Sequence, residues 1–330
     1  MSQTKKKSWI FSTIAGLLLF AVCLYLTDTP DLWAISGFNR LWLILAILAQ
    51  GGFAIPMPWR WKIVSAGANV FIPYFPAFKI TAYTSLAAAL VPQSLADLAG
   101  RGPWEARYTG TGLLNAANII LCDRLLDVFI IGLFFPPAIL LAAKIINENY
   151  SLWVGTGMAF LGLLILLLLR DKFFLLFEFL FQFIHWVCEH LPYLKGKFNW
   201  HVSPISLSTK NLCLVYAISI FKFFVMACTT YTYFRVINLE LPLVLIFFSL
   251  PVTQFIFIFA FTPGGLGIFE LGWTGILAMY GIASQDIALF IVSQRICFTL
   301  GVIFWGFIAF AMYGVNLYPP SSENSNESST

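Results

Sequence analysis

Long apolar runs separated by short polar segments dominate the chain. An α-helix needs about 20 largely apolar residues to cross the hydrocarbon core of a bilayer, so each such run predicts a membrane-spanning helix. The clear runs are residues 9–26, 41–57, 118–143, 151–169, 211–234 and 286–314. The pattern therefore predicts an all-α polytopic membrane protein with about six to eight transmembrane helices.

Two further apolar stretches, 73–91 and 242–262, each run into a proline, Pro92 and Pro263. Proline lacks a backbone N–H and interrupts a helix. Each stretch either crosses the membrane fully or breaks at its proline and returns to the side it came from. The sequence thus leaves a choice between two extra spans and two proline/glycine-broken re-entrant hairpins.

The distribution of Lys and Arg favours the hairpins, because cytoplasmic loops carry an excess of these residues. With re-entrant hairpins and a cytoplasmic N-terminus, the cations left outside are only Arg40, Lys144 and Arg235. If both stretches cross, Arg101, Arg107 and the basic region 170–210 move outside, unless residues 173–190 also cross. We therefore predict six full spans with two hairpins, and both termini in the cytoplasm.

The remaining segments set the domain boundaries. Residues 1–8 form a basic cytoplasmic N-terminus, and residues 9–316 form a single integral membrane domain. Within it, residues 172–190 mix aromatic and charged side chains, as expected of an interfacial amphipathic helix. Residues 317–330 are rich in Pro, Ser and Asn, which predicts a disordered polar tail.

The two proline breaks have matching surroundings. Arg124 follows Pro92 by 32 residues, and Arg295 follows Pro263 by the same distance. With an odd number of spans between the prolines, the second unit would be inverted relative to the first, as in many transporters. The expected repeat units are residues 73–143 and 242–314. Chance similarity of so few positions is the alternative.

The amino-acid composition excludes several classes of protein. Apolar residues make up 60% of the chain and charged residues 10%, against about 45–50% and 25% in soluble globular proteins. This excludes an ordinary soluble enzyme and a disordered chain. The net charge of +4 then concerns orientation in the membrane, and no nucleic-acid partner is expected.

Charged residues inside the apolar runs are the strongest functional candidates, since each costs from about 2.5 to more than 10 kcal/mol at the bilayer centre. Asp123, Arg124 and Asp127 interrupt one run, with Arg124 and Asp127 three apart on the predicted helix. They form either a self-neutralising ion-pair cluster that fixes helix packing, or a polar site where Arg124 forks onto a phosphate or carboxylate.

The second half offers a similar arrangement. Arg295 has no acid within a helical turn of its own helix, and Glu270 is the predicted partner. Glu270 follows a glycine-rich break that contains Pro263, Gly264, Gly265 and Gly267. Such a break exposes backbone N–H groups, and a helix that starts near Ile268 would direct its positive end at an anion. The alternative is that the glycines serve helix packing only.

The first-half break carries Pro92, Asp97 and Arg101 but fewer glycines. Arg60 is predicted at a cytoplasmic helix end, where it either snorkels and marks topology or contacts anionic headgroups. Lys222 lies deep in a span without a partner that the sequence identifies. No phosphate-binding loop, nucleophile elbow or zinc-protease motif occurs, so we predict no catalytic residue, metal or cofactor.

Taken together, four short motifs resemble the lysylphosphatidylglycerol synthase transmembrane-region family, a flippase-like domain. They are Arg60–Trp61, Pro92–Asp97, residues 123–127 and residues 263–270. The chain departs from the family pattern in having Asp123 in place of Glu and a glycine-poor first break. The family's aminoacyl-transferase domain is absent from this sequence, so lysyl transfer by this chain alone is not expected.

This resemblance implies a lipid translocator of the cell (inner) membrane that handles an anionic phospholipid, an aminoacyl-phospholipid or a polyprenyl-phosphate-linked lipid. The residues expected to bind substrate are Arg60, Pro92, Asp97, Arg101, Asp123, Arg124, Asp127, Pro263, Gly264, Gly265, Gly267, Glu270 and Arg295. Two other classes stay open. One is a membrane transferase, in which Asp123 or Glu270 acts as general base on a lipid-linked substrate, or an accessory subunit that works with a lipid synthase or glycosyltransferase. The other is a structural assembly protein. The oligomeric state is not predicted.

Overall fold

The computed structural model describes residues 37–89, 91, 96–173, 204–258 and 262–313, and single positions at 18, 21, 22, 25, 179, 186 and 190. No strand occurs among these residues, and five of their helices are long and apolar enough to cross a membrane. These helices are Arg40–Gly67, Leu113–Ala142, Asn149–Leu168, Thr209–Val236 and Ser284–Met312. The prediction of an all-α polytopic membrane protein is confirmed.

The other long helices follow their predicted bounds closely, but the one predicted at 41–57 continues to Gly67. It consists of α2 (Arg40–Ala49), the 3-10 segment η2 (Gln50–Phe53) and α3 (Pro56–Gly67). A Cβ on Gly51 would lie 2.0 Å from the Trp305 ring, so the backbone at η2 touches a neighbouring helix. The predicted helix end near residue 57 is therefore a bend within a longer element.

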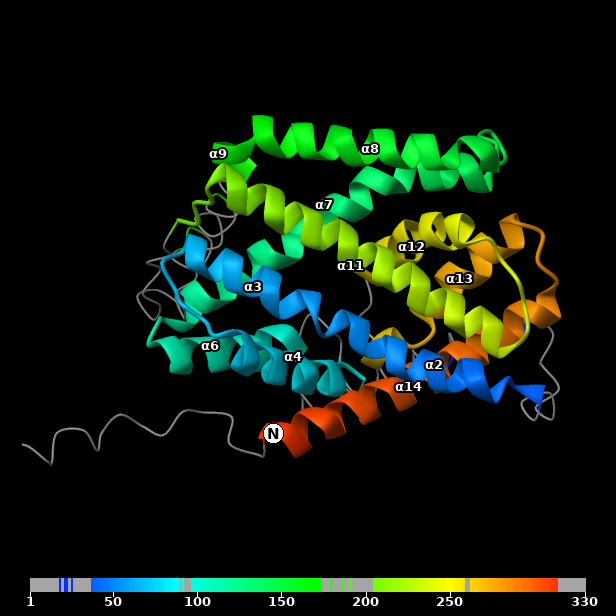
Figure 1. Cartoon of the computed structure of the whole chain (residues 1–330), viewed down its shortest axis with the longest axis horizontal. Coiled ribbons are helices and arrows are strands. Elements are labelled where there is room, and N and C mark those ends of the chain that lie inside the picture. Colours follow the sequence, from blue (N-terminus) through cyan, green and yellow to red (C-terminus); the bar gives the residue numbers. More distant parts are fainter. Residues whose placement is uncertain are drawn as a thin grey trace, which may run out of the picture.

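The long helices lie side by side in one bundle (Figure 1). α7 (Leu113–Ala142) and α8 (Glu148–Leu168) form a hairpin, which is followed by the short α9 (Arg170–Phe173). α11 (Thr209–Val236) packs on α2 and α3 along one side and on α12 (Leu243–Ile258) along another. α14 (Ser284–Tyr313) contacts α2 and α4 (Tyr74–Ala88).

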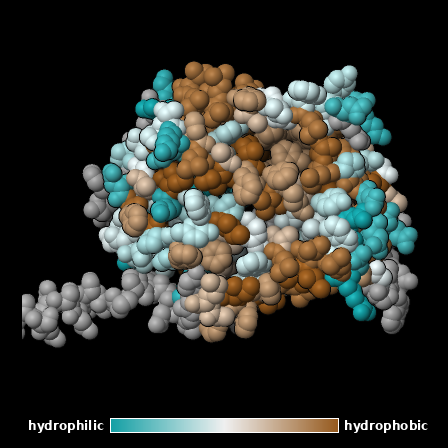
Figure 2. Space-filling view, in the orientation of Figure 1, coloured by the Kyte–Doolittle hydropathy of each residue, from teal (hydrophilic) through white to brown (hydrophobic). Residues whose placement is uncertain are grey.

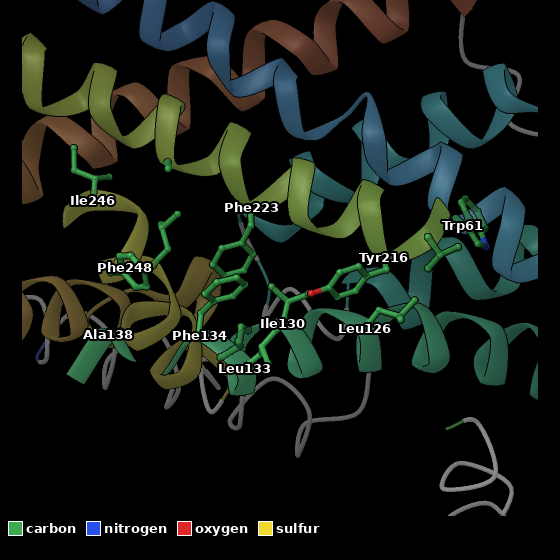
Figure 3. Packing of buried hydrophobic residues seen from close by; sticks show 14 of the residues in the cluster. Trp61, Leu126, Ile130, Leu133, Phe134, Ala138, Tyr216, Phe223, Ile246 and Phe248 are labelled. Atoms are coloured by element: carbon green, nitrogen blue, oxygen red, sulfur yellow. The ribbon is translucent and has the colours of Figure 1, made fainter. Parts of the chain in front are cut away.

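Side-chain packing joins these helices through a core of large apolar residues. Figure 3 shows Phe134 of α7 and Phe223 of α11 pointing toward each other. Phe247 of α12 packs edge-on against both rings, with centroids 5.4 Å from Phe134 and 6.2 Å from Phe223. On the visible face, hydrophobic side chains cover the middle and hydrophilic ones gather toward the helix ends (Figure 2). This is the distribution that a bilayer requires of an outer surface.

Two pairs of shorter helices interrupt the bundle. In the first half, α4 leads to a π-helical segment, η3 (Asp97–Arg101), and α6 (Gly102–Thr109). In the second half, α12 leads to η4 (Pro263–Gly265) and α13 (Ile268–Met279). With 15 residues in α4, 16 in α12 and 12 in α13, each is shorter than the roughly 20 residues of a span. Their re-entrant path through the bilayer stays a prediction.

The two breaks lie against each other. The Gly264 amide N is 3.5 Å from the Val91 carbonyl, and a Cβ on Gly264 would lie 3.1 Å from the Ala89 carbonyl oxygen. Segments that are 171 residues apart in the predicted repeat therefore meet in space. Pro92 itself, most of the predicted helices 9–26 and 172–190, and the 317–330 tail lie outside the described residues.

Candidate functional site

Arg60 lies at the centre of a buried group of charges. Its Nε is 2.7 Å from Oδ1 of Asp123, and its Nη1 is 2.5 Å from Oδ1 of Asp127. The Arg60 side chain is fully buried, so the prediction that it snorkels at a cytoplasmic helix end is wrong, whereas its contact with anionic headgroups stays a prediction. The reason is the continuation of α3, which keeps Arg60 inside the bundle and aims its guanidinium at α7.

Arg101 approaches the same aspartate from the first-half break. Its Nη2 is 3.3 Å from Oδ2 of Asp123, and its Nη1 is 3.7 Å from Oδ1 of Asp97. The guanidinium stacks over the Trp61 ring at 4.2 Å, a favourable cation–π contact. Arg101 is fully buried, so the π-helical segment η3 holds one end of the charge group in a fixed place.

Arg124 and Lys222 complete the group around Asp127. Arg124 donates to Oδ2 of Asp127 at 3.1 Å, which confirms the predicted pair, and it also donates to Asp97. Lys222 Nζ is 2.8 Å from Oδ1 of Asp127, and this gives Lys222 the partner that the sequence could not identify. We refer to the seven residues as the first-half cluster: Arg60, Asp97, Arg101, Asp123, Arg124, Asp127 and Lys222.

The second half contains a smaller ionic site, the Arg295–Glu270 pair. Arg295 donates from Nε to Oε1 of Glu270, as predicted, and from Nη1 to the Gly264 carbonyl at 2.9 Å. The other Glu270 oxygen accepts the Gly267 backbone N–H at 2.7 Å. Glu270 thus ties α14 to the start of α13 and caps the first turn of that helix.

The break beside this pair requires glycine. Gly264, Gly265 and Gly267 have φ of +57°, +66° and +81°, a region that costs other residues about 1–2 kcal/mol. This geometry turns the chain sharply between α12 and α13 and lets the Gly264 carbonyl meet Arg295. Of Pro263, which opens the break, only the backbone is described.

Substituting Gly264 by alanine is expected to lower the free energy of unfolding by about 1–2 kcal/mol, because the backbone is left-handed and the Cβ meets the Ala89 carbonyl. Gly275 is the matched control, since it lies within α13 with open space around it. Gly275→Ala is expected to be neutral or to stabilise by up to about 1 kcal/mol. Thermal unfolding of the detergent-purified proteins measures both. Equal effects would show that the break is not strained.

Each half therefore contains one arginine in a long helix that is ion-paired with an acid at the adjacent break. Arg124 pairs with Asp97 over 27 residues, and Arg295 pairs with Glu270 over 25. Asp97 follows Pro92 by five residues and Glu270 follows Pro263 by seven, so the two halves share the ionic contact but not the residue spacing. The internal repeat and its inverted orientation both stay predictions.

Several guanidinium N–H groups at these sites are buried and have no hydrogen-bond acceptor among the described residues. They are Nη2 of Arg60, Nε of Arg101 and Nη2 of Arg295. Buried donors are nearly always bonded in folded proteins. These three N–H groups are therefore unused donors inside the protein. In the part of the chain that the structure describes, no three His, Cys, Asp or Glu side chains are grouped in a way that could hold a metal ion.

Comparison with known protein families gives a match over most of the chain. The family described as Lysylphosphatidylglycerol synthase TM region matches residues 13–306. No curated protein matches the chain. The matched region includes both breaks, the first-half cluster and the Arg295–Glu270 pair.

Proposed function

Because the chain belongs to the lysylphosphatidylglycerol synthase transmembrane-region family, and so is a multi-pass membrane protein of lipid metabolism, we propose that it moves an anionic lipid between the leaflets. The candidate lipids are an anionic phospholipid, an aminoacyl-phospholipid or a polyprenyl-phosphate-linked lipid. All three carry a phosphate, the group that guanidinium recognises best.

The observation that carries this proposal is the repeated arginine–acid contact at the two breaks. Both arginines belong to long apolar helices, yet Arg124 is 25% exposed and Arg295 is 19% exposed. A purely structural ion pair in a membrane protein has no need of this exposure, since intramembrane charges face the protein interior or a polar cavity. The partly exposed side chains of Arg124 and Arg295 are where a headgroup could bind.

The paired acids have a clear role in this scheme. Asp97 and Glu270 compensate the arginines while no lipid is bound, so an empty site does not hold unpaired charges in an apolar surrounding. A phosphate can then replace a carboxylate at nearly constant charge. Exchange of one oxyanion for another lets the headgroup enter and leave.

The contacts favour this function over a transferase. In both sites, within the described residues, each carboxylate bonds to at least one cation. A nearby cation stabilises the ionised carboxylate, which makes it a weaker general base than a free one. We propose that the protein resides in the inner membrane, with both termini and the cation-rich loops on the cytoplasmic side.

Replacing Arg124 by glutamine is expected to slow lipid exchange by about 10- to 100-fold, the loss of one charge-assisted hydrogen-bonding partner. The measurement uses proteoliposomes with fluorescent phosphatidylglycerol, whose outer-leaflet label is reduced by dithionite. Arg235→Gln is the matched control, because Arg235 is 23% exposed and ion-paired with Glu240 at the end of its helix, away from both sites. Equal rates for wild type and a folded Arg124→Gln variant would refute the role of Arg124.

A further inference from the structure

The first-half cluster has an excess of positive charge. Among the described residues it contains four cations and three carboxylates. The cations are Arg60, Arg101, Arg124 and Lys222, and the carboxylates are Asp97, Asp123 and Asp127. A buried charge without a counter-charge is strongly unfavourable. The cluster therefore needs one negative charge that its own members do not provide.

Glu105 is another acid beside the cluster, and its hydrogen bonds are made with residues outside the cluster. Its carboxylate accepts hydrogen bonds from Trp61 Nε1 at 2.8 Å and from Ser65 Oγ at 3.4 Å. Glu105 lies in α6, outside the candidate spans, and burial raises its pKa to about 7 despite the Trp61 bond and the nearby Arg101 charge. A carboxyl that is half-protonated near neutral pH cancels only part of the excess.

Exposure within the cluster is concentrated at one edge, and the Asp97 side chain is only 7% exposed. Arg60, Arg101 and Asp123 are fully buried, whereas Arg124, Asp127 and Lys222 are 25%, 15% and 11% exposed. We call these last three residues the open edge. A ligand that supplies the missing charge must arrive there.

The contacts at the open edge indicate which kind of ligand could bind there. Arg124 and Lys222 bond to opposite oxygens of Asp127, at 3.1 Å and 2.8 Å, so two cations flank a single carboxylate. Arg60 holds the same carboxylate from the buried side at 2.5 Å. If an oxyanion binds to Arg124 and Lys222, Asp127 keeps Arg60 as its partner. The open edge can accept a second oxyanion without leaving an unpaired acid.

We propose that Lys222 and Arg124 together bind a phosphodiester headgroup that carries a single negative charge. This rests on the proposed function and narrows its substrate. A phosphodiester supplies the one charge that the cluster lacks, whereas a phosphomonoester brings about −1.5 to −2 near neutral pH. A zwitterionic headgroup brings a cation of its own to a site already rich in cations. Arg124 supplies a planar fork of donors and Lys222 a mobile point charge.

Binding of lipids to the delipidated full-length protein in a neutral detergent tests the proposal. The probes are phosphatidylglycerol, a phosphodiester of charge −1, zwitterionic phosphatidylcholine, and phosphatidic acid, a phosphomonoester. The wild-type protein is expected to bind phosphatidylglycerol tightest. Lys222→Gln is expected to weaken that binding by about 10- to 100-fold and to remove the preference, whereas Lys222→Arg retains it. Lys210→Gln, an exposed position on the same helix, is the control and is expected to bind like wild type.

A variant that changes the net charge of the first-half cluster gives the clearest test of the lipid preference. Asp127→Asn raises the excess from one to two and is expected to shift the preference toward phosphatidic acid. If Asp127→Asn does not fold, the Lys222 variants decide. Equal binding of the three lipids by wild type, or unchanged phosphatidylglycerol binding by Lys222→Gln, overturns the proposal. Binding in detergent requires no translocation, so a lipid preference without leaflet exchange refutes the proposed function while supporting this inference.

Discussion

Replacing Arg60 by methionine is expected to lower the free energy of unfolding by about 3–5 kcal/mol, the cost of removing one partner from a buried ion pair. Methionine keeps the length and apolar stem of the side chain, so the loss reflects charge and hydrogen bonds. Among the described residues, Asp123 then loses its closest donor, at 2.7 Å, and keeps Arg101 at 3.3 Å. Because protein stability is about 5–15 kcal/mol in total, this single change removes a large part of it.

Heat or denaturant unfolding of the purified proteins in detergent measures this loss. Lys62→Met is the matched control, since Lys62 lies two residues along α3 and contacts the Phe71 ring outside the cluster. Its effect is expected to stay within about 0.5 kcal/mol. Arg60→Lys is expected to recover only part of the stability, because one ammonium cannot reproduce the guanidinium fork onto two carboxylates. A midpoint for Arg60→Met equal to that of wild type would contradict this account.

Glu270→Gln is expected to destabilise the protein by about 2–4 kcal/mol, a buried-pair cost reduced for the partial exposure of Arg295. The glutamine amide oxygen can still accept the Gly267 N–H, so the break keeps its cap and only the counter-charge is lost. Arg295→Gln is expected to have a similar cost, because it leaves Glu270 as the unpaired charge.

The double variant Glu270→Gln, Arg295→Gln separates structure from lipid contact. With both charges removed, no uncompensated ion is left and most of the stability is expected to return. Leaflet exchange is expected to stay about 100-fold below wild type, because the guanidinium that would bind phosphate is missing. Recovery of exchange together with stability would show that the pair only holds the fold. A charge swap is less informative, since an arginine at position 270 could not accept the Gly267 N–H.

The membrane architecture follows from local features of the chain. Inside a bilayer every backbone polar group must be hydrogen-bonded within the protein. A helix is the structure in which a single long apolar run satisfies all of its own backbone groups. The Arg124–Asp127 contact is similarly local, because residues three apart on a helix are neighbours. Glu270 was identifiable as the partner of Arg295 because few other acids occur near the second break.

Arg60 shows where local reasoning failed. The glycines and prolines between residues 51 and 58 imitate a helix end, and the apolar run stops there. In the fold these glycines instead permit close packing against Trp305 and Val225, and the helix continues to Gly67. The predicted helix end near residue 57 is a bend within a longer helix. Arg60, which was expected at the membrane surface, is therefore buried.

The apolar runs, the broken segments and the residues that carry charge into the membrane are thus set by the sequence, because hydrophobic length and backbone chemistry act over a few turns. The partners of these charges are set by tertiary structure. Arg60, Asp127 and Lys222 belong to three different helices, and they meet because α3, α7 and α11 pack with particular rotations about their axes. Those rotations come from the interlocking of many side chains at once. The open edge of the cluster, with its excess positive charge, is a product of that packing.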